Sequence, residues 1–158
     1  VRPGLVSKED GRLICTPFFA TVTSLKAEKT SLEEAAPGGL IGVGTTMDPY
    51  FCKSDRLVGM VMGLEGTLPP VYHTIRVTYE LFQKTVSHTR EDLHMDEHIL
   101  LNIGSTTTGS KIREISGGEV KFELIKPCCC DVGDRISISR RIKNNWRLIG
   151  FGRIIEGE

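Results

Sequence analysis

The stretch HTIRVTYELF, residues 73–82, decides the fold class. Its apolar side chains take every second position, with charged side chains between them: Ile75, Val77, Tyr79 and Leu81 against Arg76 and Glu80. A period of two residues is typical of a half-buried β-strand, because successive side chains of a strand point to opposite faces. We therefore predict an all-β protein.

Similar short runs recur along the chain, and no stretch has the 3.6-residue period of a long helix. The further predicted strands are residues 12–19, 21–25, 40–45, 57–62, 99–103, 111–115, 119–124, 135–139 and 147–155. Turn residues predict reversals at Glu9-Asp10-Gly11, Gly117-Gly118 and Asn144-Asn145. Residues 90–98 are polar and are predicted to form a loop. Many short strands with closely spaced turns favour barrels or sandwiches.

Composition excludes several classes of protein. The 158 residues include 20 basic and 20 acidic side chains, so the formal net charge is zero, which argues against a globally basic protein that coats nucleic acid. No apolar run approaches the roughly 20 residues that a membrane-spanning helix needs, and no signal sequence is recognisable at the N-terminus. We therefore expect a cytoplasmic protein with no membrane partner.

A domain boundary is predicted around Pro69-Pro70. Proline lacks the N–H that a strand donates to its neighbour, so this pair ends any strand there. The predicted organisation is a first domain at residues 1–66, a linker at 67–72 and a second domain at 73–158.

The five cysteines are predicted to be reduced structural thiols. They are Cys15, Cys52, Cys128, Cys129 and Cys130. An odd number with three in a row does not suit a disulfide framework. Consecutive residues of a strand point to opposite faces, so the run Cys128–Cys130 is poorly shaped for a tetrahedral metal site, and no metal is predicted.

The sequence contains no complete catalytic motif. The sequence GSTTTGSK, residues 104–111, nearly spells a phosphate-binding loop, but Ser and Lys are exchanged and no helix follows, so a glycine-rich strand connection is favoured. His94 and His98 have the spacing of metal ligands on a helix, but no third ligand is evident. We predict no catalytic residue in this chain.

Two segments are candidate binding surfaces. The segment PGGLIGVGT, residues 37–45, is dense in glycine, which suits either a tight turn into a buried strand or a strand that a ligand approaches closely. Residues 135–153 include six basic side chains and no acidic one. They are either solvated strand faces or a surface that contacts RNA phosphate or another domain, and the candidates are Arg140, Arg141, Lys143 and Arg147.

Several motifs resemble the gamma subunit of translation initiation factor 2. The first domain of the chain resembles domain II of that family through PGGLIGVGT, MDP at 47–49 and SDRLVG at 54–59. The second resembles domain III through LNIGS at 101–105, Thr108-Gly109, Pro127 with Cys129, Val132-Gly133, SRRI at 139–142 and WRLIGFG at 146–152. The matches keep their order over the whole chain.

The resemblance implies two small antiparallel β-barrels of the elongation factor Tu domain II and domain III type, the first incomplete at its N-terminus. The family begins with a GTP-binding domain, so the chain is expected to be a C-terminal part of a GTPase. GTP and Mg²⁺ would then bind to the missing domain, and this part would have no catalytic role and no cofactor of its own.

The resemblance also implies partners: initiator methionyl-tRNA, the alpha and beta subunits of initiation factor 2, and the small ribosomal subunit. The pocket for the tRNA end would be formed by Ser24, Leu25, Lys26, Leu40, Ile41, Gly42 and Val43. The contact with the alpha subunit is expected in a charged loop, at Lys26, Glu28, Lys29, Glu33 and Glu34. The alternatives are another translational GTPase, selenocysteine-specific or Tu-like, and a stand-alone β-barrel interaction module.

Overall fold

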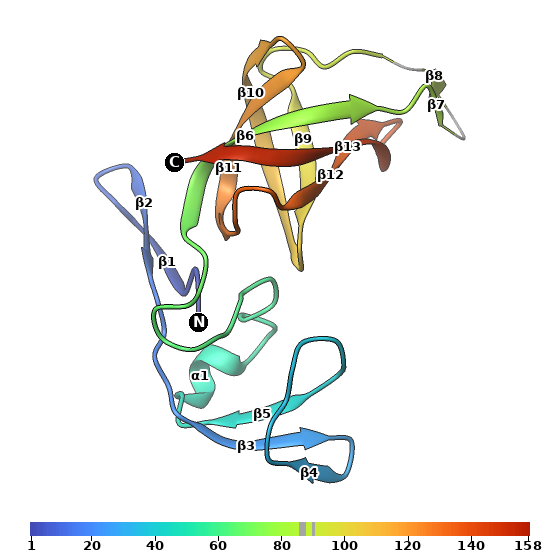
Figure 1. Cartoon of the computed structure of the whole chain (residues 1–158). Helices are drawn as coiled ribbons and strands as arrows, with labels where there is room; N and C mark the ends of the chain where they lie inside the picture. The colour runs from blue at the N-terminus through green and yellow to red at the C-terminus, as the bar shows by residue number, and fades with distance from the viewer. Residues whose placement is uncertain (86–87, 90) are drawn as a thin grey trace. The chain divides into compact units, whose positions relative to one another are not determined.

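Six strands of the computed structural model close into an antiparallel barrel (Figure 1). Its strands are β6 (Val71–Leu81), β9 (His98–Ile103), β10 (Thr106–Ser116), β11 (Glu119–Cys129), β12 (Arg135–Ile142) and β13 (Asn145–Gly157). They follow the order β10-β11-β6-β13-β12-β9, and pairing of β9 with β10 closes the ring. The structure describes residues 1–85, 88–89 and 91–158. The all-β prediction is confirmed.

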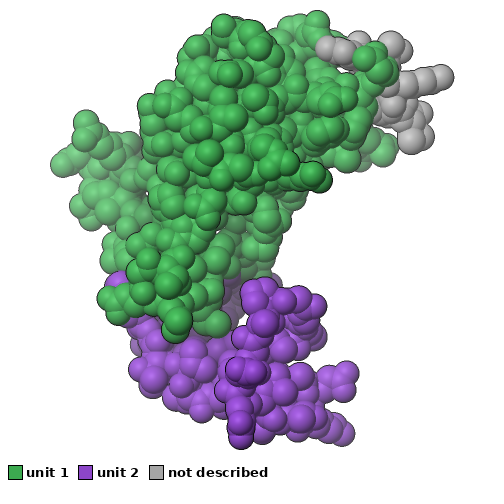
Figure 2. All heavy atoms as spheres, viewed as in Figure 1, with its two compact units in different colours: residues 1–17, 58–158 green, residues 18–57 purple. Residues whose placement is uncertain are grey.

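The chain divides into two compact units (Figure 2). Unit 1 comprises residues 1–17 and 58–158, and unit 2 comprises residues 18–57. Besides the barrel, unit 1 has the hairpin of β1 (Leu5–Glu9) with β2 (Arg12–Thr16), and the short pair β7 (Lys84–Thr85) with β8 (His88–Thr89). The predicted domain limits, 1–66 and 73–158, stay a prediction.

Unit 2 is built on an open sheet of three strands. They are β3 (Val22–Ala27), β4 (Thr30–Leu32) and β5 (Gly42–Thr45), in the order β4-β3-β5. One helical turn, α1 (Pro49–Cys52), follows, and the Asp48 carboxylate caps it by accepting a hydrogen bond from the Tyr50 amide at 2.8 Å. This sheet is not closed into a barrel. No described residue lies in a helix with the length and apolar character needed to cross a membrane.

Alternation along β6 is confirmed by burial. Ile75, Val77 and Leu81 point into the barrel, whereas Glu80 is exposed. The interior is filled by residues from all six strands, among them Ile99, Leu101, Ile112, Phe122, Ile138 and Ile154. Burial of each such side chain contributes about 1.5–3 kcal/mol, so the barrel interior is the main source of folding free energy in unit 1.

Two glycines bring β13 close to β6. A Cβ on Gly152 would lie 2.7 Å from the carbonyl oxygen of Thr78, and a Cβ on Gly150 would overlap the carbonyl oxygen of Glu80. Neither position can accept a side chain without displacement of backbone atoms. The Gly150/Gly152 seam therefore explains why the sequence WRLIGFG contains glycine at these two positions.

The predicted turns are confirmed or shifted by one residue. Asp10 with Gly11, and Gly117 with Gly118, have positive φ angles, as a two-residue hairpin turn requires. The third turn lies at Lys143-Asn144, because Ile142 pairs with Asn145. The predicted turn at Asn144-Asn145 is therefore wrong by one position.

Two strand predictions need larger corrections. Residues 57–62 form no strand, and the segment has one isolated bridge between Val61 and Arg2. Most of the predicted connection 104–111 belongs to β10, where inward-facing hydroxyls replace apolar side chains. Thr108 Oγ1 accepts a hydrogen bond from the Lys126 amide at 3.1 Å, and Ser110 Oγ donates to the Ile99 carbonyl at 3.0 Å.

Candidate binding surfaces

The residues predicted for the tRNA end lie mostly on two adjacent strands of unit 2. β3 pairs with β5 so that Lys26 lies opposite Gly42 and Leu25 lies opposite Val43. Ser24 belongs to the same strand as Lys26, while Leu40 and Ile41 come just before β5. The structure thus brings together all but Leu40 and Ile41 in one sheet.

The alternation of the strands divides this set between two faces. Leu25 and Val43 are half-buried and share a row with Leu32 of β4. Lys26 and Gly42 form the next row, which points to the opposite face and is exposed. One ligand therefore cannot contact all seven predicted side chains directly, and the solvent-facing subset is Ser24, Lys26 and Gly42.

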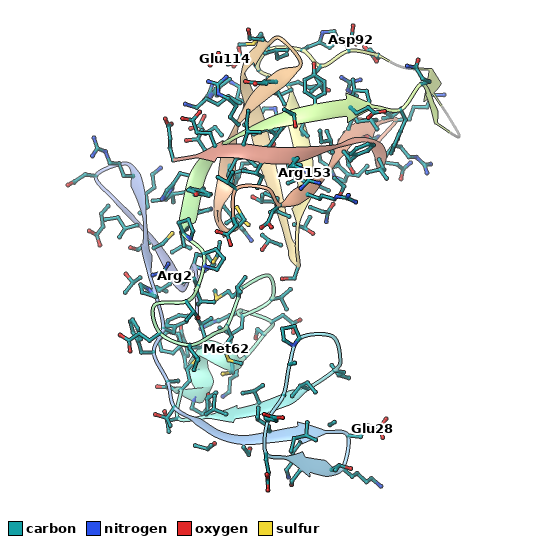
Figure 3. The ribbon with its side chains drawn as sticks, viewed as in Figure 1. Arg2, Glu28, Met62, Asp92, Glu114 and Arg153 are labelled. Carbon is teal, nitrogen blue, oxygen red and sulfur yellow. The ribbon has the colours of Figure 1, made fainter. Side chains whose placement is uncertain are left out.

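The segment predicted to contact the alpha subunit comprises the end of the β3–β4 hairpin and the loop that follows β4. Lys26 lies near the end of β3, Glu28 occupies the turn with a φ of 52°, and Glu33 and Glu34 follow β4. Figure 3 shows Glu28 at the tip of this hairpin. All five predicted side chains are exposed, and no ion pair within the described part of the chain includes any of them. The hairpin thus presents uncompensated charges of both signs.

The four candidate phosphate contacts are separated by the geometry of β12 and β13. Arg141 points outward beside Trp146, and Lys143 lies in the turn between the strands. Arg147 lies opposite Arg140, so these two leave the hairpin on the other side from Arg141. Arg141, Lys143 and Arg147 are exposed, whereas only 8% of Arg140 is exposed.

The Arg140 guanidinium is occupied inside the protein. Its Nε and Nη2 both donate to the Glu97 carboxylate, the second at 2.9 Å. Nη1 donates to the Glu91 carbonyl at 3.1 Å and Nη2 also donates to the Asp92 carbonyl at 2.8 Å. The hydrogen bond to Glu97 raises the pKa of Arg140. The prediction that Arg140 contacts phosphate conflicts with this geometry, because Arg140 instead fixes residues 91–97 against the barrel end.

The three consecutive cysteines are buried free thiols. Cys128 and Cys129 end β11, and the Cys129 Sγ lies 3.3 Å from the Pro69 carbonyl oxygen. Burial raises the pKa of the Cys129 thiol. In the described ranges no three His, Cys, Asp or Glu side chains are grouped as metal ligands. The structural role of the thiols stays a prediction.

Residues 73–154 match the family described as "Initiation factor eIF2 gamma, C terminal". The chain belongs to this family. The match covers the closed barrel from β6 to most of β13, which was the region predicted to resemble domain III.

Curated relatives extend the similarity to unit 2. The chain is 57% identical over 157 residues to the eukaryotic translation initiation factor 2 subunit gamma of Encephalitozoon cuniculi, a match that covers 99% of the chain. It is 42% identical to the protein of the same name from Schizosaccharomyces pombe and 43% identical to subunit 3 of the factor from Drosophila melanogaster. Each of these two matches covers 100% of the chain. The chain spans 35% to 37% of the length of these three relatives.

Proposed function

We propose that this chain serves in translation initiation as the part of the initiation factor 2 gamma subunit that holds the alpha subunit and supports initiator methionyl-tRNA. The observation that carries the proposal is the similarity of the whole chain to relatives with this name. Delivery of the tRNA to the small ribosomal subunit in the cytoplasm belongs to the whole factor. So do GTP hydrolysis, Mg²⁺ and the contact with the beta subunit.

Unit 2 has two surfaces whose chemistry suits binding of the tRNA end and of the alpha subunit. On one exposed face Ser24 offers a hydroxyl, Lys26 a cation and Gly42 bare backbone. These groups suit the sugar, the phosphate and the base edge of an RNA end. The neighbouring hairpin carries Glu33 and Glu34, which suit a basic partner surface. The two ligands would thus bind at adjacent parts of one sheet.

The tRNA role is tested in the whole factor that contains this chain. A Cβ on Gly42 would lie 3.6 Å from the Lys26 carbonyl oxygen, which is ordinary contact, so Gly42→Val keeps the sheet but fills the space above it. We expect methionyl-tRNA binding to weaken at least about tenfold. Gly39→Val is the matched control, since that position lies outside the strand and is also open. Unchanged tRNA binding by Gly42→Val would remove this face from the proposal.

The alpha-subunit role is tested by charge reversal. Glu33→Lys with Glu34→Lys should weaken binding of the alpha subunit about tenfold or more, because like charges would then face each other across the interface. Glu9→Lys with Asp10→Lys, in the β1–β2 turn, provides a control with the same change of charge. Calorimetric titration measures both. Equal affinities for the two double variants would exclude the hairpin as the contact.

A further inference from the structure

The outer surface of the β12–β13 hairpin has an unusual composition. Residues directly opposite each other in the register share a face, and the outward pairs run along the hairpin. They are Arg135 with Arg153, Ser137 with Phe151, Ser139 with Leu148, and Arg141 with Trp146. We call these eight residues the β12–β13 face, in which Ser139 is buried. Basic side chains lie at both ends of this face and large apolar side chains lie between them.

The cations of this face lack carboxylate partners. In the described part of the chain, no ion pair includes Arg135, Arg141 or Lys143, which adjoins the face in the turn. Arg153 donates a hydrogen bond to the Gly133 carbonyl at 2.8 Å and remains exposed (Figure 3). On the β6 side the face is bordered by Glu80, which lies opposite Phe151. On the other barrel strands Arg76, Lys111, Arg113 and Lys121 are paired with carboxylates, and Lys126 of β11 is an exposed cation without an ion pair among the described residues.

The apolar side chains between these cations are exposed. Trp146, Leu148 and Phe151 have exposed fractions of 44%, 49% and 43%. The ring of Phe151 lies 6.0 Å from that of Phe82, centroid to centroid, which extends the aromatic surface toward β6. Beside it is an open hollow of about 510 Å³, lined in part by Arg135, Phe151 and Arg153. Barrel packing explains none of these positions, because the core is filled from the other face.

We propose that the β12–β13 face binds single-stranded RNA, with phosphates on its basic side chains and bases stacked on Trp146 and Phe151. A strand of unpaired nucleotides presents both a periodic negative charge and flat aromatic bases, which is the combination that this face complements. An acidic peptide would neutralise the arginines but would leave the rings without a planar partner. The proposal rests on the proposed role in translation, and it adds an RNA contact on the barrel that is separate from the unit 2 surface.

Trp146 is the only tryptophan of the sequence, so its fluorescence reports directly on this face. Titration of the whole chain with a uridine dodecanucleotide should quench the emission to a saturating level, because a base stacks on the indole ring. The affinity should fall steeply as salt rises from about 50 mM to about 200 mM. In a parallel assay with labelled RNA, Arg141→Ala should flatten the plot of log affinity against log salt by about 0.7.

Stacking is separated from charge by variants of the aromatic residues. Trp146→Ala should weaken binding of the labelled dodecanucleotide about 5- to 100-fold, and Trp146→Phe should keep most of the affinity. Ile125→Ala is the control, since Ile125 is 61% exposed on β11 and lies outside this face. Thermal unfolding of each variant verifies the fold. A fully folded Trp146→Ala protein with unchanged RNA affinity would refute the proposal.

Two competitors identify other occupants. Inorganic polyphosphate tests for a charge-only surface, and poly-glutamate tests for an acidic protein partner. Displacement of the RNA by either at an equal concentration of charge would overturn the single-stranded RNA assignment. Failure of this proposal can be distinguished from failure of the proposed function, because Gly42→Val and Glu33→Lys test unit 2, whereas Trp146→Ala should leave alpha-subunit binding unchanged.

Discussion

The closed barrel and the open sheet of unit 2 differ most in what they bury. In the barrel every strand is paired on both edges, and its interior includes completely buried side chains such as Ile75, Leu101 and Phe122. Across residues 18–57, all of which the structure describes, no residue is buried. Leu40 and Phe19 there are 95% and 70% exposed.

The difference shows what closure contributes. Strand pairing alone satisfies backbone hydrogen bonds, but an open three-stranded sheet encloses no interior and has two free edges. A ring of strands has an enclosed face, and burial of that face supplies the hydrophobic free energy. Unit 2 therefore gains little stability from burial of apolar side chains, whereas the barrel has a core of its own.

We expect the largest effect on the free energy of unfolding when a phenylalanine is replaced in the barrel and, for comparison, in unit 2. Phe122→Ala removes a fully buried ring from the barrel and should lower the free energy of unfolding by about 3–5 kcal/mol. Phe19→Ala, in unit 2, should change it by less than about 0.5 kcal/mol. Urea denaturation followed by circular dichroism measures both. Similar losses for the two variants would mean that unit 2 has a core of its own.

A smaller effect is expected at the barrel end that Arg140 closes. Arg140→Ala leaves the Glu97 carboxylate and two carbonyls without their donor, and should cost about 2–3 kcal/mol of stability. Arg141→Ala, one residue later and exposed, should cost less than about 0.5 kcal/mol. The same denaturation assay compares them. If Arg141→Ala is the more destabilising variant, our assignment of inward and outward positions along β12 is incorrect.

The smallest effect is the pH dependence of the barrel. Arg76 lowers the pKa of Glu114, Lys121 lowers the pKa of Glu158, and Lys111 lowers the pKa of Asp96. A carboxylate with a lowered pKa in the folded state stabilises the protein above its unfolded pKa. That contribution is lost as the pH falls through the folded value, so the melting temperature should decrease between about pH 5 and pH 2.

High salt tests whether the pH dependence of the melting temperature arises from these ion pairs. At about 1 M salt the exposed pairs are screened, so the pH dependence should become shallower. Glu114→Gln should remove part of it, because the neutral amide does not titrate. Glu65→Gln is the control, since Glu65 is exposed and lies outside the barrel strands. An equal change in slope for Glu65→Gln would assign the effect to net charge rather than to the ion pairs.

The strands of the barrel were largely predictable because their inward side chains are apolar. Alternation located β6, and the glycine pair located the β10–β11 turn. Alternation of apolar side chains did not predict the first half of β10, because its inward-facing residues Thr108 and Ser110 are polar. Their hydroxyl groups donate hydrogen bonds to backbone carbonyls inside the protein. Alternation also failed at residues 57–62, because an apolar run without alternation does not specify which face is buried.

The candidate surfaces were predictable as segments but not as sets of side chains. Charge alone placed Arg140 and Arg141 together, whereas their positions in β12 send one inward to Glu97 and the other to solvent. The role of Trp146 in the β12–β13 face depends on its register with Arg141, which requires the turn at Lys143-Asn144 to be known. Long-range partners such as Glu97 leave no local signal in the sequence.

The Gly150/Gly152 seam restricts which residues β13 can accept where it pairs with β6. A single methyl group at either position would overlap a carbonyl oxygen of β6, so β13 would have to shift and its hydrogen bonds to β6 would lengthen. Random mutagenesis along β13 should therefore meet two sites that reject even alanine, a few residues from Leu148, which should accept many replacements. The observed contact between β13 and β6 thus requires two residues with no side chain.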